Sequence, residues 1–331
     1  MHDIAREAGV STATVSRVIN NPSIVEEVTR ERVLEVIAAH DYTPNALARG
    51  LLNNRTRSVG VLTVDILNPY YATVVHSIER SLSSQGNNIL LCNTGGSQDE
   101  KARYIRTLLE KRVDGLVFVG SVYRERDGTQ DILAAARSLP VIMINSIIKA
   151  ENVYCVLCDD RRGVRIALDG LIRAGRKRLL FINTASTSSA RIKEQAYRER
   201  VSELAREGLE TSVLETSPED LQGLPGRIER LLGEKAFDSI LATDDLFANV
   251  AVNCLHALHA RIPEDVWVMG YNNSYLSEQT FPRLSSVDSR MEDLGRSAAE
   301  ILSRLLAGGE VPDRIRYLEP RIVPKDSTGP L

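Results

Sequence analysis

The sequence is poor in the features that mark several classes of protein. Only 4 of its 331 residues are cysteine, too few for a scaffold held together by disulfides. No apolar run, such as Val141–Ile144, approaches the roughly 20 residues that a membrane-spanning helix needs. The first residues, Met-His-Asp-Ile-Ala-Arg-Glu, carry charges and no apolar core, so they do not read as a signal peptide. We therefore expect a soluble, cytoplasmic protein with no membrane partner.

The chain also has little net charge. Its 41 basic and 44 acidic residues leave a net charge of −3, so no global field attracts it to nucleic acid or membrane. Any basic surface must be local. Hydrophobic residues at 43% and charged residues at 26% are typical of globular proteins, and the length predicts two or three domains.

Residues 1–43 predict three short helices, at about Asp3–Ala8, Thr12–Ile19 and Glu26–His40. Ser11 is a good N-cap for the second helix, and the spacing of the first two is typical of a helix-turn-helix. Short side chains at the start of the second helix would let it approach base edges in a DNA major groove. The alternative is a cap on an ordinary small helical bundle.

Residues 44–57 form a connector. Pro44 forbids a simple continuation of the third helix, and Asn45 can cap a new helix over Ala46–Leu52. A helix of this length is not stable alone in water, and Gly50 costs it about 1 kcal/mol relative to alanine. We expect a hinge that folds only in a favourable setting; a plain tether, with Leu51 in a domain interface, is the alternative.

From residue 58 to 331 strands alternate with helices, which predicts parallel sheets with helices on both faces. This length favours two similar lobes with a cleft at the carboxyl ends of their strands. The expected strands are Val59–Val64, Ile89–Cys92, Gly115–Val119, Val141–Ile144, Val153–Leu157, Leu179–Ile182, Thr211–Leu214, Ser239–Ala242 and Val266–Met269.

Several motifs resemble, in order and spacing, those of the LacI/GalR family of bacterial transcription regulators. They include GVSTATVSRVIN (9–20), YTPNALARGL (42–51), LLEKRVDGLVF (108–118), ATDDLFA (242–248) and IPEDVWVMGY (262–271). The resemblance implies an all-α helix-turn-helix domain followed by an α/β, two-lobed, type I periplasmic-binding-protein-like sensor domain. It implies a sequence-specific DNA-binding regulator, expected to be a repressor, under the allosteric control of a small metabolite.

On the DNA side, the resemblance places Thr12, Ala13 and Arg17 at base edges and Ser16 and Asn20 near phosphates. A third group, Asn45, Ala48 and Leu51, belongs to the hinge. Leu51 would be wedged between base pairs in the minor groove, with Ala48 permitting close approach. Arg17 has the paired donors that read guanine, although a phosphate contact or a solvated charge remains open for it. The predicted DNA-binding residues are Thr12, Ala13, Ser16, Arg17, Asn20, Asn45, Ala48 and Leu51.

The alternative for Ser16 and Asn20 is a position on the helix surface or in a helix cap.

A wedge in a central minor groove implies a two-fold arrangement, and hence a homodimer or higher oligomer on a near-palindromic operator.

On the effector side, the resemblance points to six residues that would line the interlobe cleft: Tyr70, Tyr71, Asp159, Arg191, Asp244 and Asn272. An aromatic face can stack on a sugar ring, and an arginine can hold hydroxyls or a carboxylate. The alternatives are a core pair for the tyrosines, a surface ion pair for the arginine and helix N-caps for the aspartates.

Asn272 stands where the family commonly has Asp. Loss of that anion would ease the binding of an acid, so the expected effector is a sugar or a sugar acid.

Enzyme and metal interpretations are weak. Cys155 and Cys158 would point to opposite faces of a strand, and His256 and His259 lack a third ligand. A glycine pair at 95–96 lacks the full phosphate-binding fingerprint. We expect no catalytic residue, metal or cofactor. The remaining alternatives are an activator or corepressor-dependent regulator of the same family, and a cytosolic sugar-binding protein or enzyme whose N-terminal helices mediate only assembly.

Overall fold

The computed structural model describes residues 1–331 apart from 41–54, 125–127, 185–186, 205–207 and 218–219. The chain divides into two compact units, Met1–Thr56 and Arg57–Leu331. The hinge residues predicted at Asn45, Ala48 and Leu51 lie outside the described residues. No helix in the described ranges is both long and apolar enough to cross a membrane.

The first unit contains the three predicted helices, α1 (His2–Glu7), α2 (Thr12–Asn20) and α3 (Glu27–Ala39), with a 3-10 turn at Pro22–Ile24. Ser11 caps α2: its side chain accepts a hydrogen bond from the Thr14 N–H at 3.1 Å. The helices share a small core. Its buried members are Ile4, Ala5, Ala8, Val15, Val18 and Val33.

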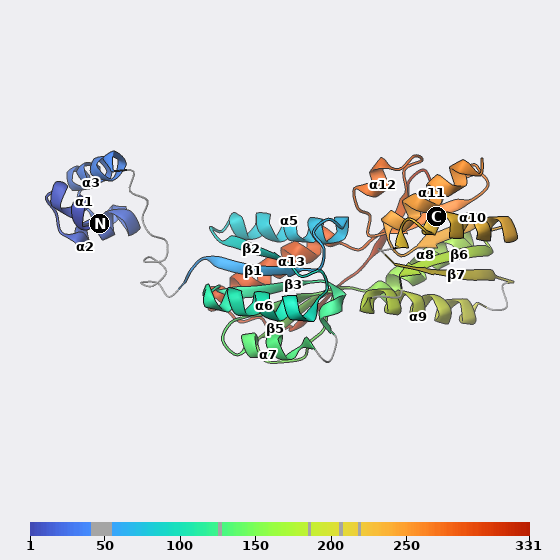
Figure 1. Ribbon diagram of the computed structural model, residues 1–331, viewed down its shortest axis with the longest axis horizontal. Coiled ribbons are helices and arrows are strands. Elements are labelled where there is room, and N and C mark those ends of the chain that lie inside the picture. The colour runs from blue at the N-terminus through green and yellow to red at the C-terminus, as the bar shows by residue number, and fades with distance from the viewer. Residues whose placement is uncertain (41–54, 125–127, 185–186, 205–207, 218–219) are drawn as a thin grey trace. The chain divides into compact units, whose positions relative to one another are not determined.

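The second unit holds two six-stranded sheets (Figure 1). The first has the order β11-β5-β4-β3-β1-β2 and is parallel throughout. Its strands are β1 (Ser58–Thr63), β2 (Asn88–Asn93), β3 (Gly115–Val119), β4 (Val141–Ile144), β5 (Val153–Cys158) and β11 (Ile315–Leu318).

Helices cover both faces of this sheet because its strands are apolar on both sides. Val59 and Val61 pack in one core with α5 (Pro69–Ser83) and α13 (Met291–Leu306). Leu62 packs in the other, with α6 (Gln98–Glu110) and α7 (Gln130–Ala136). Figure 1 shows these two helix pairs on opposite sides of the strands.

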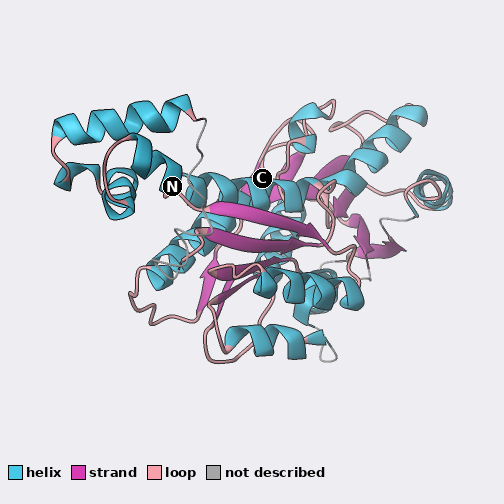
Figure 2. Ribbon diagram, turned by 60° about the vertical axis from the view of Figure 1, so that its left-hand side comes forward, coloured by secondary structure: helices cyan, strands magenta, loops and turns pink. Residues whose placement is uncertain are grey.

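The second sheet has the order β12-β10-β9-β8-β6-β7. Its strands are β6 (Arg178–Thr184), β7 (Glu210–Thr216), β8 (Ser239–Ala242), β9 (Trp267–Tyr271), β10 (Ser285–Asp288) and β12 (Arg321–Val323). One face carries α8 (Asp160–Arg173) and α9 (Ser188–Glu203), and the other carries α10 (Leu224–Glu234) and α11 (Asp245–Ala257). A short helix, α12 (Leu276–Gln279), precedes β10. Figure 2 shows the strands of both sheets between their helices.

The predicted parallel α/β architecture is confirmed, with one exception at an edge. β12 pairs antiparallel with β10. β10, β11 and β12 are absent from the predicted strands because their sequences, SSVD, IRYL and RIV, contain no apolar run. Their pairing partners place them in the sheets: β10 pairs with β9, β11 with β5 and β12 with β10.

Gly295 permits a close contact between two helices of the first lobe. A Cβ at this position of α13 would lie 2.7 Å from both the Ser77 Cβ and the Val74 carbonyl oxygen of α5. The helices are also joined by the Ser77 hydroxyl, which donates to the Glu292 carbonyl at 2.6 Å. The absence of a side chain at Gly295 therefore sets the distance between α5 and α13.

We expect Gly295→Ala to lower the free energy of unfolding by about 1–3 kcal/mol, because backbone atoms of two helices must move apart. Gly233→Ala is the matched control, since nothing lies within 4 Å of a Cβ in that exposed helical position. The control should be neutral or slightly stabilising. Denaturant unfolding of both variants tests this, and equal stability of the two would contradict the packing constraint.

Candidate functional site: an interlobe cavity and an exposed recognition helix

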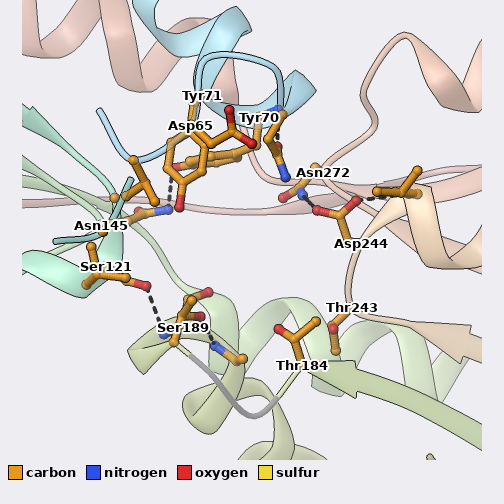
Figure 3. A pocket seen from close by; sticks show the side chains of 18 of the residues that line it. Asp65, Tyr70, Tyr71, Ser121, Asn145, Thr184, Ser189, Thr243, Asp244 and Asn272 are labelled. Carbon is orange, nitrogen blue, oxygen red and sulfur yellow. Dashed lines mark hydrogen bonds between the residues drawn. The ribbon is translucent and has the colours of Figure 1, made fainter. Parts of the chain in front are cut away.

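The carboxyl ends of both sheets open onto one cavity of about 450 Å³. Residues at or after the ends of β1, β2, β3 and β4 contribute to one side, and residues at or after the ends of β6, β8 and β9 contribute to the other (Figure 3). This is where parallel sheets place polar side chains, because each strand ends there and its loop begins. A ligand in this cavity would contact both lobes.

Two tyrosines at the start of α5 form the aromatic wall. Asn68 caps the helix by accepting the Tyr70 N–H at 2.9 Å, and the rings of Tyr70 and Tyr71 meet edge-on with centroids 5.3 Å apart. The Tyr70 hydroxyl accepts a hydrogen bond from Asn145 Nδ2 at 2.6 Å (Figure 3). The Tyr71 hydroxyl has no hydrogen-bond partner among the described residues. It is therefore available to a ligand.

Both tyrosines stay neutral at physiological pH. Burial raises the pKa of Tyr70 well above its usual value, and the negative charge of Asp160 adds to the shift. Burial raises the pKa of Tyr71 to about 12, with further contributions from Asp244 and Asp65. The two hydroxyls are therefore donors as well as acceptors in the cavity.

Lys193 and Asp160 form a buried ion pair in the opposite wall. The Lys193 ammonium lies 3.9 Å from Asp160 Oδ1, donates to the Thr243 carbonyl at 3.1 Å and sits 3.6 Å above the Tyr271 ring centre. Asp160 also accepts the Tyr271 hydroxyl at 3.0 Å and the Ser189 hydroxyl at 2.5 Å. Both charges are thus balanced within the wall, as buried charges must be.

The approach of Tyr271 to Asp160 depends on Gly163. A Cβ there would lie 2.2 Å from the Tyr271 hydroxyl.

Asp244 and Asn272 meet at the end of the second sheet. Asp244 caps α11 by accepting the Leu246 N–H at 2.9 Å, and its other oxygen accepts Asn272 Nδ2 at 3.0 Å (Figure 3). Burial raises the pKa of Asp244. A second carboxylate at position 272 would repel Asp244 at this distance, whereas the amide donates to it.

Among the described residues, a hydrogen bond joins the two lobes across the cavity. The Ser121 hydroxyl, just after β3, accepts the Ser189 N–H of α9 at 3.2 Å (Figure 3). Because Ser189 also binds Asp160, the bridge between lobes adjoins the buried ion pair.

Four of the six predicted effector residues line the cavity together: Tyr70, Tyr71, Asp244 and Asn272. Asp159 and Arg191 are not part of its lining. The structure places the Asp159 carboxylate on the first turn of α8, where it accepts the Arg162 N–H at 3.0 Å. It places the exposed Arg191 side chain against the Ser188 hydroxyl at 3.1 Å. Their assignment to the effector stays a prediction without support from their positions.

Among the described lining residues, the cation is Lys193, two residues beyond Arg191. Ala190, Lys193, Ala196 and Tyr197 are the buried residues of α9, and this spacing of three and four is that of one helix face. Helical periodicity could therefore have selected Lys193 and assigned Arg191 to the solvent side. The sequence could also have placed Asn145 in the cavity, because it is the first polar residue after the buried strand Val141–Ile144.

In the first unit, α2 presents a distinct outer face. Ala13 and Arg17, one helical turn apart, are exposed, while Val15 and Val18 are buried on the opposite side. Thr12 and Ser16 are half-buried at the edge of the exposed face, and Asn20 is the last residue of the helix. The predicted base-reading residues thus share a surface that another molecule can reach.

The two cysteines of the CVLC motif lie on opposite faces of β5, as predicted. Cys155 packs in one core of the first sheet and Cys158 in the other. Within the described ranges, no group of three His, Cys, Asp or Glu side chains could hold a metal ion.

Two family models match the chain in succession. The model described as "Bacterial regulatory proteins, lacI family" matches residues 1–45, and "Periplasmic binding proteins and sugar binding domain of LacI family" matches residues 56–320. The chain belongs to the LacI family. It is a helix-turn-helix transcription regulator of that family, as the sequence motifs indicated.

Individual relatives agree along the full length. An HTH-type transcriptional regulator of Lachnoclostridium phytofermentans is 34% identical, with 98% of each chain covered. The HTH-type transcriptional repressor PurR of Aliivibrio fischeri is 31% identical, with 98% of this chain and 97% of that protein covered. The fold is similar to that of the lac repressor dimer bound to operator and the anti-inducer ONPF, with a TM-score of 0.86, 22% identity and 98% of each chain covered.

Asp245, the residue after Asp244, is a fully buried support of the site. It accepts the Ser274 N–H and hydroxyl at 2.6 and 2.8 Å and the Ser286 hydroxyl at 2.6 Å. Burial raises the pKa of Asp245 to about 7, and the neighbouring Asp244 adds to the shift.

A carboxyl whose pKa is higher in the folded than in the unfolded chain binds more protons when folded, so its ionisation destabilises the fold as pH rises from about 4 to 7. Asp245→Asn removes this ionisation. We expect the melting temperature of the variant, relative to the parent, to increase between pH 5 and pH 8. A difference that does not change across this range would show that Asp245 is already ionised in the folded protein at pH 5.

Proposed function

We propose that this regulator is a repressor that binds a near-palindromic DNA operator as a homodimer and is controlled by a carbohydrate in the interlobe cavity. The observation that carries the proposal is the combination, in one chain, of an exposed recognition face on α2 and a polar, tyrosine-walled cavity between two lobes. The repressor named PurR, similar over nearly its whole length, supports repression. The sugar-binding family model supports the ligand class.

On the DNA side, Thr12, Ala13 and Arg17 would contact base edges, and Ser16 and Asn20 would lie near phosphates. Asn45, Ala48 and Leu51 would form the hinge in the minor groove. A two-fold operator follows because the hinge of each protomer would enter the same central groove.

On the ligand side, the cavity lining combines hydroxyl and amide groups with the rings of Tyr70, Tyr71 and Phe247. Such a mixture suits a sugar, whose hydroxyls need partners and whose C–H faces pack on aromatic rings. Because Arg191 lies outside the lining, the argument for a sugar acid loses the cation on which it depended.

The ligand would control DNA binding because the two binding equilibria are thermodynamically linked. A ligand that contacts both lobes favours the lobe arrangement in which it binds best, and the operator favours the arrangement that allows the hinges to fold. A coupling of about 1–3 kcal/mol between the sites changes affinity about 5–150-fold. We assign no catalytic step to the cavity, and we expect the protein to act in the cytoplasm, where the DNA is.

The DNA half is tested by selection from random duplexes with the full chain, followed by gel shifts on the selected sequence. The selected sites should be near-palindromic. Arg17→Ala should lower affinity for them about 5–150-fold, the effect of losing one paired base contact. Arg6→Ala is the control, since Arg6 is exposed on α1 and pairs with Asp3. Equal affinity of the two variants would remove Arg17 from base recognition.

The same gel shifts, repeated with sugars, decide the sign of control. Release of DNA by a bound sugar supports an inducible repressor. Tighter binding would instead identify a corepressor.

The tyrosine pair provides the effector test. Tyr71→Phe should weaken sugar binding, measured by calorimetry, by about three- to tenfold while leaving the melting temperature unchanged, because its hydroxyl has no protein partner in the described part of the chain. Tyr70→Phe is the matched comparison. It should lower stability by about 1 kcal/mol, since it removes the bond from Asn145. Unchanged sugar affinity in Tyr71→Phe would place the ligand elsewhere.

A further inference from the structure

The charged residues that line the cavity are unequal in number. Asp65, Asp160 and Asp244 bring three carboxylates, and Lys193 brings the one ammonium among the described lining residues. The cavity is therefore negative overall while those carboxylates are ionised.

Asp160 and Lys193 neutralise each other's charge. Their charged atoms are 3.9 Å apart, both side chains are more than nine-tenths buried, and Asp160 receives two further hydroxyl donors. The Lys193 ammonium is also engaged by the Thr243 carbonyl and the Tyr271 ring. This pair therefore leaves no free positive charge to attract an acidic ligand.

Among the described residues, the hydrogen-bond donors to Asp65 and Asp244 are neutral. The charge of Lys193 also acts on Asp244 and lowers its pKa, against the larger rise that burial causes. Asp65 accepts the Leu67 N–H at 3.0 Å, and Asp244 accepts the Leu246 N–H and the Asn272 amide. Within the part of the chain that the structure describes, no Lys or Arg side chain forms a salt bridge with either carboxylate. Asp65 is exposed and Asp244 is half-buried, so the free-energy cost of an unpaired carboxylate falls mainly on Asp244.

The two carboxylates belong to different lobes and flank the same group. Asp65 follows β1 of the first sheet, and Asp244 follows β8 of the second. Both lie close enough to Tyr71 to raise its pKa, so their negative charges meet near the hydroxyl that has no partner. Figure 3 shows Asp65 beside Tyr71, with Asp244 across the cavity from them.

We propose that the effector is an amino sugar, whose protonated amine binds between Asp65 and Asp244 beside Tyr71. This inference rests on the proposed function, because it names the chemical class of the carbohydrate. The ammonium supplies a counter-charge in direct contact, which neither carboxylate has among the described residues, and the face of Tyr71 can add a cation–π contact.

Binding of a cationic ligand would also favour the approach of the two lobes toward each other. Two carboxylates on facing lobes repel each other when the lobes approach, and a cation between them reverses the sign of that interaction. A neutral sugar of the same shape would fill the cavity without this effect. An amino sugar should therefore change operator affinity more than its parent hexose does.

The experiment compares matched pairs by calorimetry with the full-length protein at pH 6.5. The pairs are D-glucosamine with D-glucose, D-galactosamine with D-galactose, and 6-amino-6-deoxy-D-glucose with D-glucose; D-glucuronate and N-acetyl-D-glucosamine are added as acidic and uncharged probes. We expect at least one amino sugar to bind about tenfold or more tightly than its parent, the effect of one charge-assisted hydrogen bond.

Charge-removing variants assign the effect to the two carboxylates. Asp244→Asn and Asp65→Asn should reduce the preference for the amine several-fold each, and asparagine retains the capping acceptor at position 244. Asp313→Asn is the control, because it removes an exposed carboxylate outside the cavity lining. It should leave the preference unchanged.

Three results would overturn the inference. Tighter binding of the parent hexoses or of glucuronate would reject the cationic ligand while leaving a carbohydrate-controlled repressor intact. An amine preference that survives in both Asp65→Asn and Asp244→Asn would reject the two carboxylates as its source. If none of these probes binds and none changes operator affinity in gel shifts, the inference falls together with the carbohydrate half of the proposed function.

Discussion

The cleft of this regulator depends on how its buried charges are balanced. Lys193 neutralises Asp160 within the wall of the second lobe, and the hydroxyls of Tyr271 and Ser189 complete the coordination of that carboxylate. Because Lys193 and Asp160 neutralise each other, the remaining charge in the cavity is negative, and it comes from both lobes. The proposed ligand class, the role of Asn272 as a neutral donor and the contribution of Asp245 to stability all depend on the partners available to the carboxylates in and beside the cavity.

Much of the fold could be predicted because the pattern of apolar residues along the sequence marks individual strands and helices. Runs such as Val141–Ile144 are buried on both faces of a parallel sheet, so they read as short apolar segments between helices. The three short strands β10, β11 and β12 could not be found this way. They pair only because neighbouring strands offer open edges, and this information lies in the tertiary structure rather than in SSVD, IRYL or RIV.

The site was predicted less completely, and α9 shows why. Family motifs drew attention to Arg191, but the burial of Ala190, Ala196 and Tyr197 turns Lys193 inward and Arg191 outward. A helix periodicity argument could have corrected this. Asp65 was missed although it directly follows the predicted strand Val59–Val64. Its proximity to Asp244 could not be predicted, because the two are 179 positions apart by residue number and the sequence does not show which loops of the two sheets face each other.

The arrangement also explains why a small ligand can control a large regulator. The cavity walls come from loops and from the N-terminal parts of α5, α8, α9 and α11, while the strands behind them are packed between helices and resist deformation. Binding energy therefore acts on the relation between the lobes rather than on the lobes themselves. The Ser121–Ser189 bond crosses the cavity next to the Asp160–Lys193 pair. A ligand that alters the charge balance in the cleft thus acts directly beside a bond that joins the two lobes.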